Sequence, residues 1–250
     1  MQKVLVAFSG GVDSSFLLYI AKEVLGAENV LAVIAQSPTY PMVEIEGAIR
    51  IADELGISCQ LIKTEEFSDE NFICNSTNRC YYCKKELFSQ LKKIAVESGI
   101  SYVLDGSNFD DLSDYRPGSR AKNELGIHSP LQEAQLAKDD IRQLSKRVAL
   151  STWDKPSMAC LSSRVPYGTR ITLAILYKIG EAEKFLKSLG LKQVRVRHHD
   201  QLARIEVEEK EIDRILNDGI RVKITRKLEE LGYFFVALDL AMLYDLWFIS

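Results

Sequence analysis

The sequence predicts an α/β protein, in which a parallel sheet carries helices on both faces and a small C-terminal α+β domain follows. Three observations support this prediction. Short apolar segments alternate with helical segments through the first half of the chain. A segment rich in glycine and serine follows the first apolar segment. After Thr172 the alternation gives way to a pattern typical of an antiparallel hairpin between helices.

The first half contains short apolar segments that predict buried strands, at 4–8, 30–35, 57–62 and 102–104. Apolar residues at helical spacing predict helices at 13–25, 43–55 and 84–98. From 105 to 167 the pattern loosens into polar stretches that contain glycine and proline, around a short helix at 139–148. Because long loops in a compact domain tend to be functional, we expect binding residues in this region.

The last third of the chain has a different organisation. A helix is expected at 173–189, a hairpin at 193–199 and 202–207, helices at 210–216 and 220–231, and a strand at 233–238. We therefore predict a first domain over 1–171 and a second over 172–250. The second domain is expected to bind substrate or to mediate oligomerisation, and we expect a homo-oligomer.

The charge and the distribution of apolar residues limit which kinds of partner the protein is expected to bind. The 250 residues include 32 basic and 35 acidic side chains, for a net charge of −3. A protein that binds nucleic acid is usually basic, so we expect no nucleic-acid partner. No apolar run approaches the roughly 20 residues of a membrane span, and the N-terminus lacks the pattern of a secretory signal. We therefore expect a cytoplasmic protein without a membrane partner.

The segment Ser-Gly-Gly-Val-Asp-Ser-Ser at 9–15, called the phosphate loop below, lies between the first predicted strand and helix. This is the carboxyl end of a parallel sheet, where α/β proteins bind ligands. Glycines let the backbone approach an anion, the helix N-terminus attracts phosphate, and Asp13 can hold a Mg²⁺ ion that bridges phosphates. The segment lacks the Lys-Ser/Thr pair of a Walker A loop. The predicted pyrophosphate-binding residues are Ser9, Gly10, Gly11, Asp13, Ser14 and Ser15.

The chain has five cysteines, and two of them form a close pair, Cys80-Tyr-Tyr-Cys83, directly before the helix expected near Lys84. This spacing suits an iron–sulfur cluster, a zinc site or a redox dithiol, and a pair without a role is also compatible with it. A third cluster ligand could be Cys74 or Cys160, and spacing does not choose between them. Cys59 lies inside a predicted strand and is expected to be a small core residue.

Five segments in order resemble the LarE family of ATP-dependent sulfur transferases. They are the phosphate loop, Leu-Asp-Gly-Ser-Asn at 104–108, Asp-Tyr-Arg-Pro-Gly at 114–118, Cys-Leu-Ser-Ser-Arg-Val-Pro-Tyr-Gly at 160–168 and Val-Arg-Val-Arg at 194–197. The resemblance implies a PP-loop domain, of the adenine nucleotide alpha hydrolase-like fold. It also implies that ATP adenylates a carboxylate of pyridinium-3,5-biscarboxylic acid mononucleotide with release of pyrophosphate, and that sulfur then displaces AMP to leave a thiocarboxylate.

The resemblance also implies roles for individual residues. Cys80, Cys83 and Cys160 would hold a [4Fe-4S] cluster that carries the sulfur, and Cys160 and Asp13 would be catalytic. Family members differ in whether the sulfur comes from a cluster or from a sacrificed cysteine, and the sequence leaves this open. Asp105 and Gly106 would face ATP. The substrate phosphate would be held by Ser163, Arg164, Arg195 and Arg197, because Arg195 and Arg197 share one face of a strand.

Three alternatives remain at this stage. A PP-loop tRNA thiolase would share the adenylation and cluster chemistry, but it predicts a basic surface and an added RNA-binding module. An amide-forming PP-loop ligase would use ammonia and would not need Cys80, Cys83 and Cys160. A nucleotide-binding sensor would release no pyrophosphate.

Overall fold

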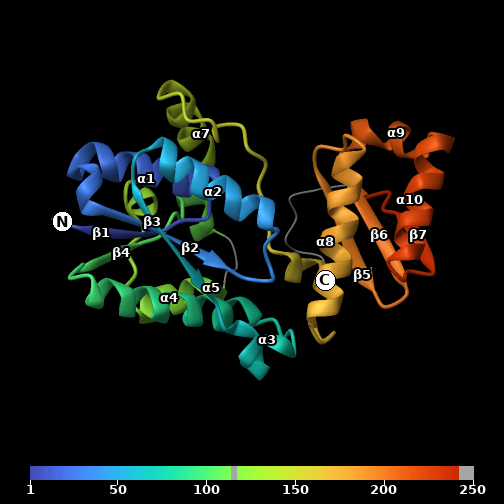
Figure 1. The fold of residues 1–250 in the computed structure, drawn as a ribbon, viewed down its shortest axis with the longest axis horizontal. Helices are drawn as coiled ribbons and strands as arrows, with labels where there is room; N and C mark the ends of the chain where they lie inside the picture. The colour runs from blue at the N-terminus through green and yellow to red at the C-terminus, as the bar shows by residue number, and fades with distance from the viewer. Residues whose placement is uncertain (114–116, 242–250) are drawn as a thin grey trace. The chain divides into compact units, whose positions relative to one another are not determined.

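A computed structural model describes residues 1–113 and 117–241. The chain forms two compact units, Met1–Met158 and Ala159–Ser250, and each has its own hydrophobic core (Figure 1). Residues 159–171, which we predicted in the first domain, group with the second unit. Residues 114–116, which belong to the third segment of family resemblance, lie outside the described residues.

The first unit is built on a parallel sheet with the strand order β3-β2-β1-β4. Its strands are β1 (Val4–Ala7), β2 (Val30–Gln36), β3 (Ser58–Lys63) and β4 (Tyr102–Leu104), close to the predicted positions. In register, Leu5 of β1 lies opposite Leu31 of β2 and Val103 of β4. Strands β2 and β3 lie on one side of β1, and β4 lies on the other side. The direction in which strands are added to the sheet therefore reverses at β1. Ligands of open α/β sheets bind at such a reversal, beyond the carboxyl ends of the strands.

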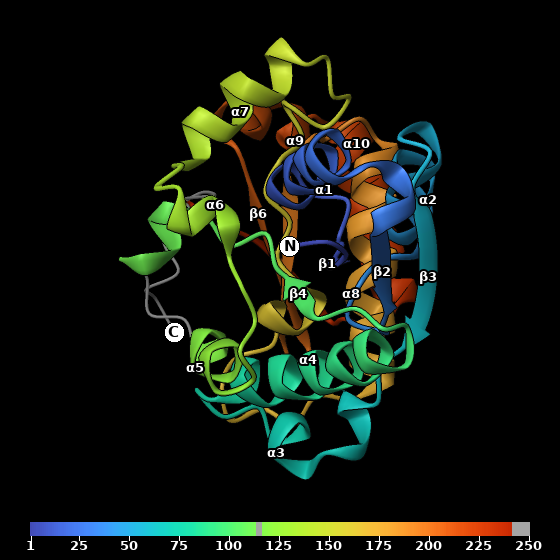
Figure 2. The same ribbon diagram turned by 90° about the vertical axis from the view of Figure 1, so that its left-hand side faces the viewer.

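Helices cover both faces of this sheet, as predicted. Val4 and Val6 belong to the core beneath α1 (Val12–Leu25), α2 (Met42–Glu54) and α7 (Lys138–Arg147). Leu5 belongs to the core beneath α4 (Arg79–Glu97). Figure 2 shows α1 and α4 on opposite sides of the sheet. The shorter elements are η1 (Ala27–Asn29), η2 (Glu66–Ser68), α3 (Glu70–Ile73), η3 (Phe109–Leu112), α5 (Pro117–Glu124) and α6 (Pro130–Glu133).

Helix α4 begins at Arg79, and the prediction of a start near Lys84 is therefore wrong. Tyr81 is buried on the same side of the helix as Phe88, seven positions later, so the apolar stripe of α4 already begins in its first turn. The cysteine pair consequently lies inside the helix instead of in the preceding loop. Side chains three positions apart on a helix are neighbours, so Cys80 and Cys83 lie on one side of α4.

The second unit is a small three-stranded sheet packed on helices, with the strand order β5-β6-β7. Strand β5 (Val194–His199) pairs with β6 (Leu202–Val207) as the predicted antiparallel hairpin, and β7 (Phe235–Leu238) runs parallel to β6. The other elements are η4 (Leu161–Arg164), α8 (Leu173–Ser188), η5 (Glu209–Glu211), α9 (Ile212–Leu216) and α10 (Asp218–Glu230). Val194 and Val196 enter the core, so the alternate residues of β5 occupy the other face of the sheet.

Packing explains why residues 159–171 group with the second unit. Leu161 of η4 is buried, and its Cδ1 lies 3.4 Å from the position that a Cβ would take on Gly180 of α8. Arg164, in the same short helix, forms an ion pair with Glu183 of α8. These contacts depend on residues far along the chain, and the loss of βα alternation did not reveal them. Within the described part of the chain, none of the helices has the length and apolar character needed to cross a membrane.

Candidate active site

The phosphate loop is shaped by its backbone. Gly10 has a φ of +67°, a left-handed conformation that residues with a Cβ rarely adopt. A Cβ at this position would lie 2.8 Å from the Cβ of Ala48 in α2, so the loop also needs the space that glycine leaves. Gly11 is the N-cap residue of α1, and no side chain caps this helix. The first N–H groups of α1 are therefore available for an anion at the carboxyl end of β1.

The serines of the loop lie together at the start of α1. The Oγ atoms of Ser9 and Ser14 are 3.1 Å apart, and the N–H of Ser9 also points to Ser14 Oγ at 3.4 Å. Ser15 is fully buried, and its Oγ has no hydrogen-bond partner among the described residues. The structure thus brings the predicted serines together around one helix end.

Asp105 and Gly106 follow β4, the strand that neighbours β1, and the structure places them beside the phosphate loop. A Cβ on Gly106 would lie 3.0 Å from the backbone nitrogen of Ser14, so this glycine permits close contact with the first turn of α1. The Asp105 carboxylate accepts hydrogen bonds from Ser129 Oγ and from Ser107 Oγ, the latter at 2.6 Å. These bonds hold a buried carboxylate at the switch point of the sheet.

Asp13 is the acidic residue in the first turn of α1. Its Oδ2 accepts from Lys138 Nζ at 2.7 Å and from Asn108 Nδ2 at 3.4 Å. Its Oδ1 is buried and has no hydrogen-bond partner among the described residues. A carboxylate oxygen without a partner, beside a helix end that attracts phosphate, fits a Mg²⁺ ion, which prefers oxygen ligands. The described residues contain no group of three or more His, Cys, Asp or Glu side chains that could enclose a metal. Phosphate and water would therefore supply most of the ligands.

Two lysines contact the loop and were missed by the sequence analysis. Lys138, at the start of α7, pairs with Asp13 from 125 positions away. Lys155 donates to the carbonyl oxygen of Gly10 at 2.9 Å from 145 positions away, and it also pairs with Glu44 of α2 at 2.8 Å. No spacing in the sequence signals such contacts, because they arise only when the loop region 105–158 folds back over β1.

The cysteines are distributed over both units. Cys80 and Cys83 are half-buried in the first two turns of α4, and Cys160 is half-buried at the N-cap position of η4. Cys74 is exposed, and its thiol points to the carbonyl oxygen of Asn71 at 3.4 Å. Cys59 packs against the core, and burial, with a smaller effect of Asp53, raises the pKa of its thiol. The predicted core role of Cys59 is thus supported.

The outer face of the small sheet carries Arg195, Arg197 and Arg204, and we call it the arginine face. Arg197 of β5 lies opposite Arg204 of β6 in the register of the hairpin. Glu206 accepts from both, at 2.8 Å from Arg197 Nε and at 3.2 Å from Arg204 Nη2. Arg197 also donates to the carbonyl oxygen of Ser163 at 2.8 Å. The structure therefore brings Arg197 of β5 against Ser163 of η4, two of the predicted substrate-binding residues. It also adds Arg204, which the sequence analysis did not select.

Arg164 lies away from solvent, with a side chain only 4% exposed. Its guanidinium donates to Glu183 at 2.8 and 3.4 Å and to Ser163 Oγ at 2.8 Å. Glu183 also accepts from the backbone N–H of Val196 at 3.0 Å. This network connects η4, α8 and β5, so it favours a supporting role for Arg164 over direct contact with a substrate.

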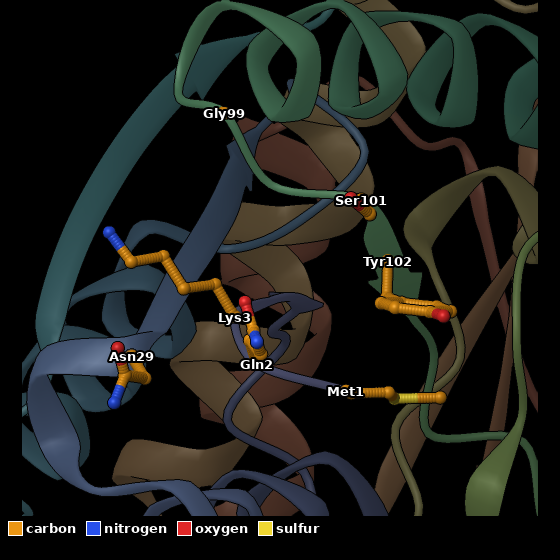
Figure 3. Close-up of a pocket in the computed structure, with 7 residues that line it drawn as sticks. All are labelled: Met1, Gln2, Lys3, Asn29, Gly99, Ser101 and Tyr102. Atoms are coloured by element: carbon orange, nitrogen blue, oxygen red, sulfur yellow. The ribbon is translucent and has the colours of Figure 1, made fainter.

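A separate surface depression lies at the amino-terminal ends of the sheet strands. It is lined by Met1, Gln2, Lys3, Asn29, Gly99, Ser101 and Tyr102 (Figure 3). Lys3 and Tyr102 lie before or at the starts of β1 and β4, whereas the phosphate loop follows the end of β1. Because α/β sheets bind ligands at the carboxyl ends of their strands, the depression is not part of the candidate site.

Comparison with known proteins identifies the family of this chain. Pyridinium-3,5-bisthiocarboxylic acid mononucleotide synthase of Lactiplantibacillus plantarum is 42% identical over 242 residues, which cover 96% of this chain and 86% of the relative. The chain belongs to this family, the LarE family. An uncharacterised protein of Synechocystis is 43% identical over 96% of this chain and 89% of its own length. The predicted family and enzyme class are confirmed: LarE proteins are ATP-using enzymes of the PP-loop superfamily.

More distant similarities are limited to parts of the chain. The NAD synthase family model matches residues 1–78, which include the phosphate loop but end before Cys80. The tRNA-specific 2-thiouridylase MnmA of Carboxydothermus hydrogenoformans is 28% identical over 62% of this chain and 53% of its own length. Both similarities cover only part of this chain, whereas the relatives from Lactiplantibacillus plantarum and Synechocystis each match 96% of it.

Proposed function

We propose that this chain is an ATP-dependent sulfur transferase. It adenylates a carboxylate of pyridinium-3,5-biscarboxylic acid mononucleotide, releases pyrophosphate, and converts the carboxylate to a thiocarboxylate. The observation that carries this proposal is the phosphate loop, with Gly10 in a left-handed conformation and an uncapped α1, in a chain that matches a LarE synthase over 96% of its length. The loop lacks a Walker lysine, so it suits a leaving pyrophosphate better than a transferred γ-phosphate.

In the first half-reaction, the N–H groups of α1 and the hydroxyls of Ser9 and Ser14 would bind the pyrophosphate part of ATP. Asp13 would hold the Mg²⁺ ion through its unpartnered Oδ1. The ion would neutralise charge on the phosphates as the bond to AMP breaks. Asp105 and Gly106, beside Ser14, would border the nucleotide at the switch point of the sheet.

The substrate is a mononucleotide, and its phosphate needs cationic partners. Arg195, Arg197 and Ser163 remain our proposed residues, because an arginine fork can bind phosphate by two parallel hydrogen bonds. Arg164 would act indirectly, since it fixes Ser163 Oγ from a buried ion pair.

The sulfur step is assigned to the cysteines. Cys80 and Cys83 are two thiols of the right chemistry on one side of α4, and we propose that Cys160 of the second unit completes a [4Fe-4S] ligand set. When bound, such a cluster would supply an open iron for the sulfur that is transferred. Cysteine thiolates are suitable ligands for such a cluster. Two of the three proposed ligands, Cys80 and Cys83, belong to the first unit, and Cys160 belongs to the second.

The cysteine proposal is tested by iron and sulfide analysis and by visible absorption after anaerobic purification. Cys80→Ala, Cys83→Ala and Cys160→Ala should each lose the iron and the brown colour, while pyrophosphate release continues. Cys59→Ala and Cys74→Ala are matched controls and should retain both. If Cys74→Ala lost the iron while Cys160→Ala kept it, the third ligand would be local and Cys160 would need another role.

The proposed reaction is tested by its products. With Mg-ATP and the dicarboxylate nucleotide, the protein should release pyrophosphate and AMP, and mass spectrometry should detect the thiocarboxylate. Release of ADP and inorganic phosphate would contradict the assignment. An amide product with ammonia would favour the ligase alternative suggested by the NAD synthase similarity, and thiolation of tRNA would favour the thiouridylase alternative. A cytoplasmic location and a homo-oligomer remain predictions from the sequence.

A further inference from the structure

We propose that Lys138 is an exchangeable counter-ion of the phosphate loop: it neutralises Asp13 when the loop is empty and moves to a phosphate oxygen when Mg²⁺ and pyrophosphate bind. This inference rests on the proposed function, because it assumes that the loop binds Mg-pyrophosphate. It adds a phosphate-binding residue that lies outside the loop motif.

The first argument is electrostatic. Lys138 Nζ lies 2.7 Å from Asp13 Oδ2, and the two side chains are 30% and 20% exposed. The ammonium therefore neutralises the same carboxylate that would hold the cation through its other oxygen, Oδ1. A carboxylate that binds Mg²⁺ must give up or share such a partner, since the two cations repel each other at short range.

The second argument concerns which atoms of Lys138 can move. Its backbone N–H donates to Asp110 Oδ2 at 2.8 Å, and the neighbouring Ala137 N–H donates to Asp140 Oδ2 at 3.1 Å. These bonds hold the main chain at the start of α7. The side chain is a charge on a flexible four-carbon stem, so its ammonium can change partner while the backbone stays in place.

The third argument is the charge that the ligand brings. Pyrophosphate carries several negative charges, and the loop itself contains no lysine or arginine. Lys155 is already shared between Gly10 O and Glu44, where it supports the loop against α2. Lys138, by contrast, is bonded to a side chain in the first turn of α1, where phosphate would bind. It is therefore the better placed of the two lysines to take over a phosphate oxygen.

The exchange predicts effects of opposite sign on two ligands. In Lys138→Met, inorganic pyrophosphate with Mg²⁺ should bind about 10- to 100-fold more weakly, as expected for a lost charge-assisted hydrogen bond. Mn²⁺ alone, used as a spectroscopic substitute for Mg²⁺, should bind about threefold or more tightly, because the competing ammonium is gone. Lys138→Arg should retain most of the pyrophosphate affinity.

The measurements are calorimetric titration with Mg-pyrophosphate and electron paramagnetic resonance of free Mn²⁺. Lys146→Met is the matched control: Lys146 is on the same helix, its ammonium lies 4.5 Å from the centre of the Trp153 ring, and its loss should change neither affinity. Equal affinities in Lys138→Met and wild type, or weaker binding of both ligands in Lys138→Met, would overturn the inference. The second result would indicate a merely structural ion pair. If the wild type itself bound no Mg-pyrophosphate, the proposed function would fail, and the inference with it.

Discussion

The phosphate loop and the arginine face are both proposed to bind an anion, but they are built in different ways. The loop relies on backbone N–H groups and hydroxyls at the uncapped start of α1, and glycines give it its shape. The arginine face relies on long side chains that already have partners. Glu206 bonds to both Arg197 and Arg204, and Asp239 lies 3.2 Å from Arg204.

This difference predicts how each site would bind its ligand. The backbone donors of α1 keep their direction whether or not a ligand is present, so the loop is preorganised. An arginine that is shared with a carboxylate must loosen that bond before it can grip a phosphate. Binding at the arginine face is therefore an exchange of ion pairs, and its net free energy is the difference between two similar interactions.

The largest effect is expected in the loop. Asp13→Ala removes the carboxylate proposed to hold Mg²⁺, which stabilises charge by several kcal/mol, so pyrophosphate release should fall about 100-fold or more. The fold should survive, because Asp13 is partly exposed and contributes to no apolar core. Initial rates of pyrophosphate release check this, with Asp139→Ala of α7 as a control that keeps its rate. A variant Asp13→Ala with unchanged rate would remove the metal role from this loop.

The second effect concerns stability behind the arginine face. Arg164→Met would leave Glu183 charged and buried, and breaking one side of a buried pair costs about 3–5 kcal/mol. The double variant with Glu183→Gln should recover part of this, because the amide oxygen can still accept from Val196. Chemical denaturation checks both variants. Arg221→Ala removes a surface pair with Asp218 and should cost at most about 1 kcal/mol. Equal losses at Arg164 and Arg221 would show that the buried network is not important for stability.

A third, smaller effect is expected on the affinity for the substrate. Arg195→Ala or Arg197→Ala should weaken substrate binding by about 1.5–3 kcal/mol, the range for a hydrogen bond to a charged group. Affinity for ATP should be nearly unchanged in both, because the phosphate loop is a separate site. Titration with each ligand measures the two affinities. Arg214→Ala serves as the control, because Arg214 of α9 donates to the carbonyl oxygens of Leu189 and Gly190 at the end of α8. Unchanged substrate affinity in both variants would place the phosphate elsewhere.

The smallest effect is a pH dependence from the inner face of the same sheet. Burial lowers the pKa of His198 below its ordinary value of 6.5, and burial raises the pKa of Tyr233, its partner at 3.2 Å, to about 12. Just below pH 6.5, His198 is therefore protonated to a larger extent in the unfolded chain than in the folded chain. Stability should rise with pH through the window just below 6.5 and level off above it.

Denaturation midpoints from about pH 5 to 8 would measure this slope. His198→Phe should flatten it in part. A remainder should persist from His199, whose pKa is lowered by burial and by Arg204 and Arg197. A slope that His198→Phe leaves unchanged would assign the effect to other groups.

The sequence predicted the parts of the site that are local. The phosphate loop, the strand before it and the helix after it follow from adjacent residues, and the segment at Asp105 follows from the strand next to β1. The predicted start of α4 is too late, because the apolar stripe of the helix already includes Tyr81 in its first turn. That error moved Cys80 and Cys83 from a helix into a loop.

The parts that could not be predicted are long-range. Nothing near Asp13 signals Lys138, and nothing near Arg164 signals Glu183, because these partners meet only after the chain folds. An arginine in a motif looks available in sequence, whereas the structure shows which acid it already binds. For this reason the sequence could propose Arg164 and Arg197 as phosphate ligands, but it could not show that Arg164 pairs with Glu183 and Arg197 with Glu206.

The contact between Gly10 and Ala48 has a consequence for how this enzyme tolerates change. Ala48 is fully buried in α2 and has no polar group to offer a nucleotide, yet it occupies the volume that borders the loop. Gly10 cannot be replaced by a larger residue without strain, because residues with a Cβ rarely adopt its φ of +67°. Gly10 and Ala48 are therefore already in close contact, and neither position has room for a larger side chain. A larger residue at position 48 would press on the phosphate loop, so this apolar position of α2 constrains the candidate active site although it offers no group to a ligand.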